Sequence, residues 1–477
     1  MKAPFSAYLT QVAPSLKELV SLLNEDYDYV SLLASDSVGF SVRISTRAKS
    51  VSNNTLTTEK GFVVRVYKDG LYSEYSFNEY DPTKVKETAN EIKEYLNRSL
   101  EVLKITNTKV YETPILKDEP IELFKEFECE QLPENVDLDA LIESFTALCE
   151  KGISLGEHMI DVSIIGQSTH ISKMFITKNR DMRQSYVYSE GTLIPRASLD
   201  GRNEMGYYGV SGRRGAEIFE GLEKELVEGV RLTEELLHAK RIVPGEYDII
   251  TTPEVSGLIA HEAFGHGVEM DMFVKDRALG AKYVDQRVGS DMVTMHEGAN
   301  VLEEVASYAF DDEGTLAGDV IEIDHGILKT GICDALAALR LGIEPTGNGK
   351  HENFEHKAYT RMTNTIFDSG ESTLEEMIAT VKHGYLLKGM KSGMEDPKHW
   401  GIQCIIERGY EIKDGKLTGE VVTPVIMTGY VPELLGSISM VSNDREAFGN
   451  GACGKGHKEW VKVSDGGPCF KAKARLG

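Results

Sequence analysis

Apolar residues in the first half of the chain follow two different periods. A spacing of three to four residues predicts amphipathic helices at residues 15–23, 83–98 and 136–151. Strand-like runs lie between and after them, at residues 38–44, 63–77, 159–165 and 171–177. The second of these runs predicts a hairpin that turns at Asp69 and Gly70, a dipeptide typical of two-residue loops. The pattern therefore predicts helices combined with a mixed sheet.

A change in the pattern of predicted secondary structure near the middle of the chain indicates a domain boundary. An acidic and apolar repeat over residues 216–240 predicts a long helix, and the Pro-Gly pair at 244–245 closes it. Beyond it, many short strands alternate with turn dipeptides. We predict an α+β protein with an N-terminal α/β domain over residues 1–243 and a β-rich C-terminal domain over residues 244–477. The composition allows a subdivision of the first domain near residues 100–135.

Two helix starts carry capping signals. Asn135 precedes the helix predicted over 136–151 and is a preferred N-cap residue. Ser372 and Glu375 have the spacing of a capping box before a helix over 373–382. Both signals predict where these helices begin.

Composition narrows the classes of function. The 477 residues include 52 Lys and Arg against 76 Asp and Glu, which gives a net charge of −24. This balance disfavours direct nucleic-acid binding or attachment to anionic membranes. The chain shows no secretory signal and no apolar stretch that could span a bilayer. Its six scattered cysteines contain no CxxC pair, so we expect free thiols and a cytoplasmic location.

The segment 251–271 carries the clearest chemistry. Thr252 can cap a helix that begins at Pro253, and further along His261, Glu262 and His266 spell H-E-x-x-x-H. This resembles the zincin motif H-E-x-x-H with one extra residue. The motif places two imidazoles and a carboxylate close together in sequence, as a metal-dependent hydrolase requires.

The extra residue has a geometric consequence. In a regular helix, residues four apart diverge by about 40° around the axis, whereas residues five apart diverge by about 140°. His261 and His266 can therefore share one ion only if the helix widens into a π-type turn or unwinds locally. Gly265 and Gly267 flank the second histidine and make such a distortion easier.

The motif alone leaves alternatives open. A chance match in a chain of this composition has a probability of about 0.03, and both histidines could be ordinary helix-end residues with Glu262 as a solvated acid. A third ligand must come from elsewhere, and the candidates are Glu269, Asp271, His296, Cys453 and His457. Cys453 lies in a glycine-rich segment in which Lys455 would favour the thiolate.

Several segments together resemble the TldD/PmbA metallopeptidase family. They are HEAFGHGVEMD, DDEGT (311–315), TGNGK (346–350), RMTNT (361–365) and GACGKGHKEWVKVSDGGPCF. The resemblance covers about residues 210–477 and is weaker before them. It implies one Zn²⁺ per chain bound by His261, His266 and Cys453, with Glu262 as the catalytic residue.

The same resemblance implies a zinc metallopeptidase that hydrolyses unfolded or extended peptides inside a dimeric chamber. The dimer would be a homodimer or a heterodimer with a paralogous subunit. Arg361, Lys455 and His457 are candidates for substrate or oxyanion contacts, and His457 replaces a glutamine that is usual in the family.

Other functions fit the residues less well. One alternative is a zinc hydrolase of a non-peptide amide, and another is a catalytically silent peptide-binding subunit with a structural metal. The presence of Glu262 disfavours the silent subunit, because a structural site has no use for a general base. The segment 449–456 matches a phosphate loop in part, but Gly456 stands where a Mg²⁺-binding Ser or Thr is needed.

Overall fold

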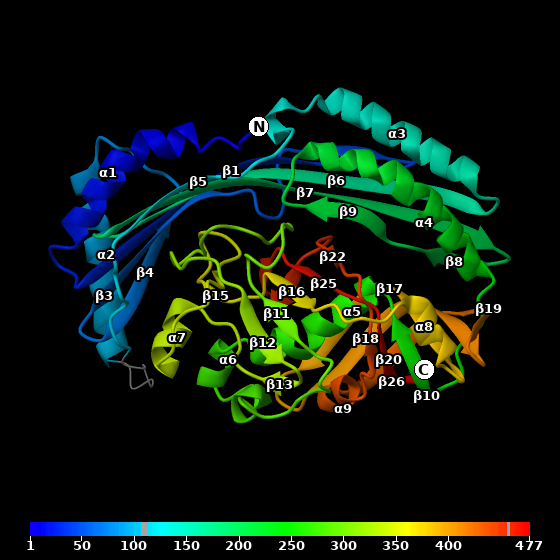
Figure 1. Ribbon diagram of the computed structural model, residues 1–477. Helices are drawn as coiled ribbons and strands as arrows, with labels where there is room; N and C mark the ends of the chain where they lie inside the picture. Colours follow the sequence, from blue (N-terminus) through cyan, green and yellow to red (C-terminus); the bar gives the residue numbers. More distant parts are fainter. Residues whose placement is uncertain (106–112, 456–457) are drawn as a thin grey trace.

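The computed structural model describes residues 1–105, 113–455 and 458–477. A long curved sheet from the first half arches over the second half, which lies against its concave side (Figure 1). Helices α1 to α4 lie on the outer, convex side of this sheet (Figure 1).

The arching sheet is mixed, as the sequence predicts. Its main path runs β4-β3-β1-β6-β7-β5, with β2 paired to β1 and with β8 and β9 paired to β7. Among these pairs, β5 and β7 are parallel and the others are antiparallel. The strands are β1 Tyr29–Ile44, β2 Lys49–Ser52, β3 Lys60–Lys68, β4 Leu71–Phe77, β5 Ile121–Glu126, β6 Met159–Ile176, β7 Arg180–Leu199, β8 Arg202–Met205 and β9 Tyr208–Gly212.

The hairpin predicted at residues 63–77 is confirmed. It is formed by β3 and β4, and both turn residues have positive φ, 53° at Asp69 and 82° at Gly70. The two short strands predicted at 159–165 and 171–177 are one continuous strand, β6. The sequence between them reads as a break because Ser168, Thr169 and His170 are polar, yet these side chains are buried.

Four helices pack on the outer face, namely α1 Ala7–Leu23, α2 Val85–Ile105, α3 Leu138–Leu155 and α4 Leu222–Leu237. Helices α1 and α2 bury leucines, valines and isoleucines against β1 and β3, and α3 and α4 form a second apolar core against β6 and β7. The cap predicted at Asn135 is wrong. Asn135 ends a short 3-10 turn, and the Asp137 side chain accepts the capping hydrogen bond from Ala140 N. The helix predicted over 216–240 begins as a 3-10 turn, Ala216–Gly221, before α4.

The second half is rich in β-structure. A seven-stranded sheet follows the order β10-β17-β18-β20-β26-β21 with β19 on β18, and a six-stranded sheet follows β13-β12-β11-β16-β25-β22. The strands of the first are β10 Gly245–Thr251, β17 His383–Asp396, β18 Gly401–Lys413, β19 Lys416–Val422, β20 Val425–Tyr430, β21 Met440–Val441 and β26 Phe470–Leu476. Those of the second are β11 Met295–Glu297, β12 Val320–Asp324, β13 Ile327–Leu328, β16 Asn364–Phe367, β22 Glu446–Phe448 and β25 Ser464–Gly467.

Two small ribbons and several short helices complete this half. The ribbons pair β14 Gly349–Lys350 with β15 Tyr359–Thr360, and β23 Cys453–Lys455 with β24 Lys458–Val461. The helical segments are α5 Pro253–Ala260, α6 Asp271–Val274, a 3-10 turn Leu279–Lys282, α7 Ala335–Leu341, α8 Leu374–Ala379 and α9 Val431–Gly436. The capping box of α8 is formed by Thr373 and Glu376, one residue later than predicted.

Helix α5 lies between the two C-terminal sheets and contacts both β17 and β25. Its apolar side chains Val255 and Ile259 are fully buried in the main core. Thr252 occupies the predicted N-cap position, but its hydroxyl donates to Leu387 O at 3.1 Å and caps no helix N–H. The packing on both sides fixes the end of α5, where the histidines lie.

These features confirm the predicted α+β class, with a mixed sheet first and a β-rich second half. The boundary at 243–244 stays a prediction, although α4 ends at Leu237 and β10 begins at Gly245. Within the described residues, no helix combines the length and apolar character that crossing a bilayer requires.

Candidate metal centre and the cavity around it

Helix α5 widens at its C-terminal end. Residues His261–Gly265 form a π-helical turn, and His266 N donates to His261 O five residues back. This is the distortion that the H-E-x-x-x-H spacing predicts, because the wider turn absorbs the extra residue. The two imidazole rings consequently meet edge to face, with centroids 5.0 Å apart and planes at 87°.

Gly265 is required by packing at this turn. A Cβ atom on residue 265 would lie 2.2 Å from Met362 Sδ, which is far inside van der Waals contact. Met362 itself is fully buried. The absence of a side chain therefore lets the widened helix pack against the chain that leads into β16.

Cys453 completes a group of three side chains of the types that bind transition metals. The ligand atoms of His261, His266 and Cys453 all lie within 4.8 Å of one another, and Cys453 Sγ is 3.3 Å from His266 Nε2. Cys453 opens β23, whereas the histidines end α5, so two distant segments meet here. Two imidazoles and a thiolate suit a borderline-soft transition metal and leave a fourth position open.

The charges of the three groups are coupled. Burial alone would raise the pKa of the Cys453 thiol, but the adjacent imidazoles of His261 and His266 lower that pKa to about 5. Burial would likewise lower the pKa of both imidazoles, and the neighbouring thiolate raises it. Without a metal, the thiolate of Cys453 and the protonated imidazoles thus stabilise each other. A bound cation can replace those protons.

A buried ionic network supports His266 and Cys453. Glu269 Oε2 lies 3.3 Å from His266 Nδ1, and Glu269 is also held by Lys455 Nζ at 3.2 Å and Arg361 Nε at 3.3 Å. Burial would raise the pKa of Glu269, but the Lys455 charge and then His266 lower it, so the carboxylate stays ionised. Arg361 Nη2 also contacts Cys453 Sγ at 3.2 Å. The network therefore fixes two of the three ligands from behind.

Arg361 is a buried member of this network. Its side chain is fully buried and is not among the residues that line the cavity, so its role as a substrate or oxyanion contact stays a prediction. Lys455 does line the cavity, and its ammonium group bonds Asp271 Oδ1 at 2.7 Å. His457, the third residue considered for substrate contact, lies outside the described residues.

Glu269, Asp271 and His296, three other candidates for a third ligand, are bound by other side chains, and the fourth, His457, lies outside the described residues. Glu269 and Asp271 both bind Lys455. His296 lies in β11 and bonds Asp319 and Asp368. The glycine-rich segment continues from β23 into β24 and opens no helix, which removes the phosphate-loop alternative.

Glu262 faces the cavity beside the three ligands. Only 7% of the residue is exposed, and burial raises the pKa of its carboxyl group. Its side chain lies against β17 at Gly393, where a Cβ atom would come within 2.4 Å of Glu262 Cγ. A carboxylate of raised basicity in this position can take a proton from a water molecule.

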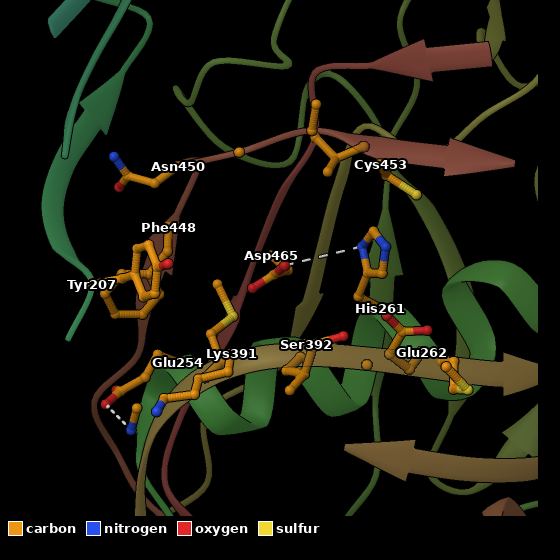
Figure 2. Close-up of a pocket in the computed structure, with 18 of the residues that line it drawn as sticks. Tyr207, Glu254, His261, Glu262, Lys391, Ser392, Phe448, Asn450, Cys453 and Asp465 are labelled. Atoms are coloured by element: carbon orange, nitrogen blue, oxygen red, sulfur yellow. Dashed lines mark hydrogen bonds and ion pairs between the residues drawn. The ribbon is translucent and has the colours of Figure 1, made fainter. Parts of the chain in front are cut away.

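The cavity has a volume of about 1080 Å³ and is lined by residues from both halves of the chain. Figure 2 shows His261, Glu262, Cys453 and Asp465 at one end, and Tyr207, Phe448 and Asn450 toward the other. Tyr207 precedes β9 of the arching sheet, whereas Lys391 and Ser392 belong to β17. The volume is large enough for a peptide segment of several residues.

Two acidic residues at the cavity escaped the sequence analysis as individual candidates. Asp465 of β25 lies 4.0 Å from His261 Nδ1, and burial raises its pKa to about 7. Glu395 of β17 also lines the cavity, and burial raises its pKa to about 9. The signal available for Asp465 was its place in the terminal block KVSDGGPCF. Nothing in the sequence around Glu395 distinguishes it from a surface acid.

Comparison with known proteins defines the class of this fold and site. Residues 244–468 match the PmbA/TldA metallopeptidase C-terminal domain. A metalloprotease of Methanocaldococcus jannaschii is 34% identical over 50% of this chain and 52% of its own length. A zinc metalloprotease TldD homolog of Saccharolobus solfataricus is 32% identical over 48% of this chain and 51% of its own.

Residues 244–468 therefore carry the C-terminal domain of the TldD/PmbA metallopeptidase family. The chain spans about half the length of the two curated relatives described above. The resemblance in fold to solved structures covers a larger share of the chain than these sequence matches. The crystal structure of TldE from Thermococcus kodakarensis superposes with a TM-score of 0.75 at 17% identity, over 97% of this chain and all of that one.

Proposed function

We propose that this chain is a zinc-dependent metallopeptidase that hydrolyses peptide bonds of unfolded or extended peptides. The observation that carries the proposal is the π-helical turn, which brings His261 and His266 together beside Cys453 and leaves Glu262 facing the cavity. The names of the relatives, metalloproteases and a zinc metalloprotease, support the same class of reaction. Two imidazoles and one thiolate favour zinc among the common metals.

Each side chain then has a defined task. His261, His266 and Cys453 would hold the zinc ion, which supplies a Lewis acid for the attacking water and the scissile carbonyl. Glu262 takes a proton from the attacking water and delivers it to the leaving amine. Its buried position and raised pKa suit both transfers, because the group must accept and release a proton near neutral pH.

An open strand edge supports an extended substrate. Among the described residues, strand β17 pairs with β10 only through Gly384–Leu387, whereas it pairs with β18 through residues 383–396. The part of β17 beyond β10 lines the cavity and passes Glu262 at Gly393. An extended peptide can add to such an edge through backbone hydrogen bonds, which select for unfolded chains and little for sequence.

Exposed apolar side chains at the rim of the cavity support the proposal that a second subunit covers it. Large apolar side chains are exposed there, namely Tyr207 at 51%, Met394 at 61% and Trp460 at 43%. Exposed apolar groups around a cavity are typical of surfaces that a partner covers. We propose a dimer, made with a second copy or with a paralogous TldE-like subunit, that encloses the cavity. All six cysteines are free and buried, which agrees with a cytoplasmic location.

The first experiment measures the zinc content per chain of wild-type protein and of the Cys453→Ala and Glu262→Gln variants. We expect about one zinc in the wild type and in Glu262→Gln, and much less in Cys453→Ala. Hydrolysis of a denatured peptide mixture, with and without the paralogous subunit, should be lost in Glu262→Gln. Wild-type turnover in that variant would overturn the general-base role. Zinc binding without hydrolysis in the wild type would favour the silent-subunit alternative.

A further inference from the structure

The two histidines of the metal centre differ in how their Nδ1 atoms are satisfied. His266 has Nε2 3.3 Å from Cys453 Sγ and Nδ1 3.3 Å from Glu269 Oε2. One edge of this ring thus faces the other ligands, and the opposite edge faces a carboxylate. His261 Nδ1, in contrast, is buried and has no hydrogen-bond partner within the described part of the chain.

Asp465 lies where a partner for His261 is required. Its Oδ2 atom is 4.0 Å from His261 Nδ1, and only 8% of Asp465 and 6% of His261 are exposed. Figure 2 shows Asp465 on one side of the imidazole ring and Cys453 on the other. Asp465 Oδ1 also has no hydrogen-bond partner among the described residues. The unpartnered Nδ1 of His261 therefore faces Oδ2 of a buried carboxyl group whose other oxygen, Oδ1, also lacks a partner.

The surrounding backbone fixes this juxtaposition. Asp465 lies in β25, where it is opposite Thr365 of β16 and Phe448 of β22. On the helix side, a Cβ atom on Gly257 would lie 2.5 Å from Asp465 Oδ1. Gly257 precedes His261 by four residues and so shares its face of α5. The missing side chain lets this face approach β25 closely enough for the contact.

We propose that Asp465 is the positioning residue of His261, an inference that rests on the proposed function. Its carboxylate accepts a hydrogen bond from His261 Nδ1–H, which selects the tautomer whose Nε2 lone pair points toward the metal. The separation of 4.0 Å exceeds a hydrogen bond, and a movement of about 1 Å by the ring or the carboxylate closes it. Asp465 thus does for His261 what Glu269 does for His266.

A direct role as a fourth metal ligand fits the geometry less well. Asp465 faces Nδ1 of His261, whereas the cluster of ligand atoms includes Cys453 on the opposite side of the ring (Figure 2). A carboxylate on the far side of a ligand ring cannot share the ion that the ring binds. The position is that of a group acting through the histidine.

The experiment measures the dissociation constant of Zn²⁺ for metal-free protein by competition with a chromophoric chelator. The variants are Asp465→Asn, which keeps the volume, and Asp465→Ala. Glu446→Gln is the matched control, because Glu446 lines the same cavity on neighbouring β22. We expect the dissociation constant to rise about 10- to 100-fold in both Asp465 variants. Glu446→Gln should stay within twofold of the wild type.

A second readout uses the wild type and so does not depend on how the variants fold. Imidazole ¹⁵N spectra of the zinc-loaded protein should show His261 protonated at Nδ1, and Asp465→Asn should move that resonance. Coordination of His261 through Nδ1, or zinc affinity within twofold of wild type in both Asp465 variants, would overturn the inference. Failure of the wild type to bind zinc would instead refute the proposed function, so the two failures are distinguishable.

Discussion

Substitution of Gly393 by alanine tests whether Glu262 is the catalytic base. The new Cβ atom would lie 2.4 Å from Glu262 Cγ, whereas ordinary contact begins at 3.4 Å, so the carboxylate must move by about 1 Å. Residue 393 lies within β17 and its φ is outside the positive region, so alanine suits the backbone. A misplacement of about 1 Å near the reacting atoms costs about 100-fold in rate, or about 2.7 kcal/mol.

The assay compares kcat/KM on an extended fluorogenic peptide with the zinc content and the thermal unfolding midpoint of the same preparations. We expect Gly393→Ala to lose about 100-fold in kcat/KM and to keep its zinc, because the three atoms nearest to the new Cβ all belong to Glu262. Gly429→Ala is the control, since a Cβ at that β20 position meets nothing within 4 Å. A kcat/KM within threefold of wild type in Gly393→Ala would refute the argument that placement of Glu262 limits the reaction.

Two further predictions concern stability. Burial would raise the pKa of Asp312, but His351 and Lys173 lower it to about 2, below the usual value of 3.8. Because the pKa is lower in the folded state, this carboxylate contributes about 2 kcal/mol of stability above pH 4, which is lost as the pH falls toward 2. Urea unfolding between pH 2 and 6 should show the unfolding free energy falling with pH in the wild type and falling less in Asp312→Asn. An equal fall in both proteins would contradict the assignment. At the π-helical turn, Gly265→Ala should cost about 1–3 kcal/mol of unfolding free energy through its clash with Met362. In a double-mutant cycle with Met362→Ala, the double variant should lose about 1 kcal/mol less unfolding free energy than the sum of the two single variants. A loss equal to that sum would exclude the clash as the cause.

Local spacing predicted the most unusual feature of the site. The five-residue interval between His261 and His266 requires a widened turn if the rings are to meet, and the π-helical turn is present. Helix periodicity is a local property, so one short segment was enough for this prediction. Cys453 was one of several open candidates until the family resemblance singled it out, because its contact with His266 joins residues 187 positions apart.

The supporting groups could not be predicted for the same reason. The sequence suggested Arg361 only as a candidate for substrate or oxyanion contact, and it gave no sign that this side chain is fully buried between Glu269 and Cys453. Its environment is created by the packing of three separate segments. Likewise, two strands were predicted where β6 is continuous, because the polar residues 168–170 find hydrogen-bond partners, such as Ser189 for Ser168, on a neighbouring strand.

The predicted helix caps were wrong by one or two residues. Asn135 and Asp137 are both good capping residues, and the chain uses the second because a proline-led 3-10 turn occupies residues 133–135. Ser372 and Thr373 present the same choice, and the chain again uses the later residue. Sequence signals identified these helices and could not decide between adjacent caps of similar strength.

The walls of the cavity come from segments that can change independently of one another. The proposed metal ligands all lie in the second half of the chain, at His261, His266 and Cys453, whereas Tyr207 and Tyr208 line the cavity from the first half. Mutations in the loop before β9 can therefore reshape the space available to a peptide without disturbing the ligands or Glu262. Paralogues with the same catalytic half could diverge in this way, each with its own set of peptides and all with one reaction.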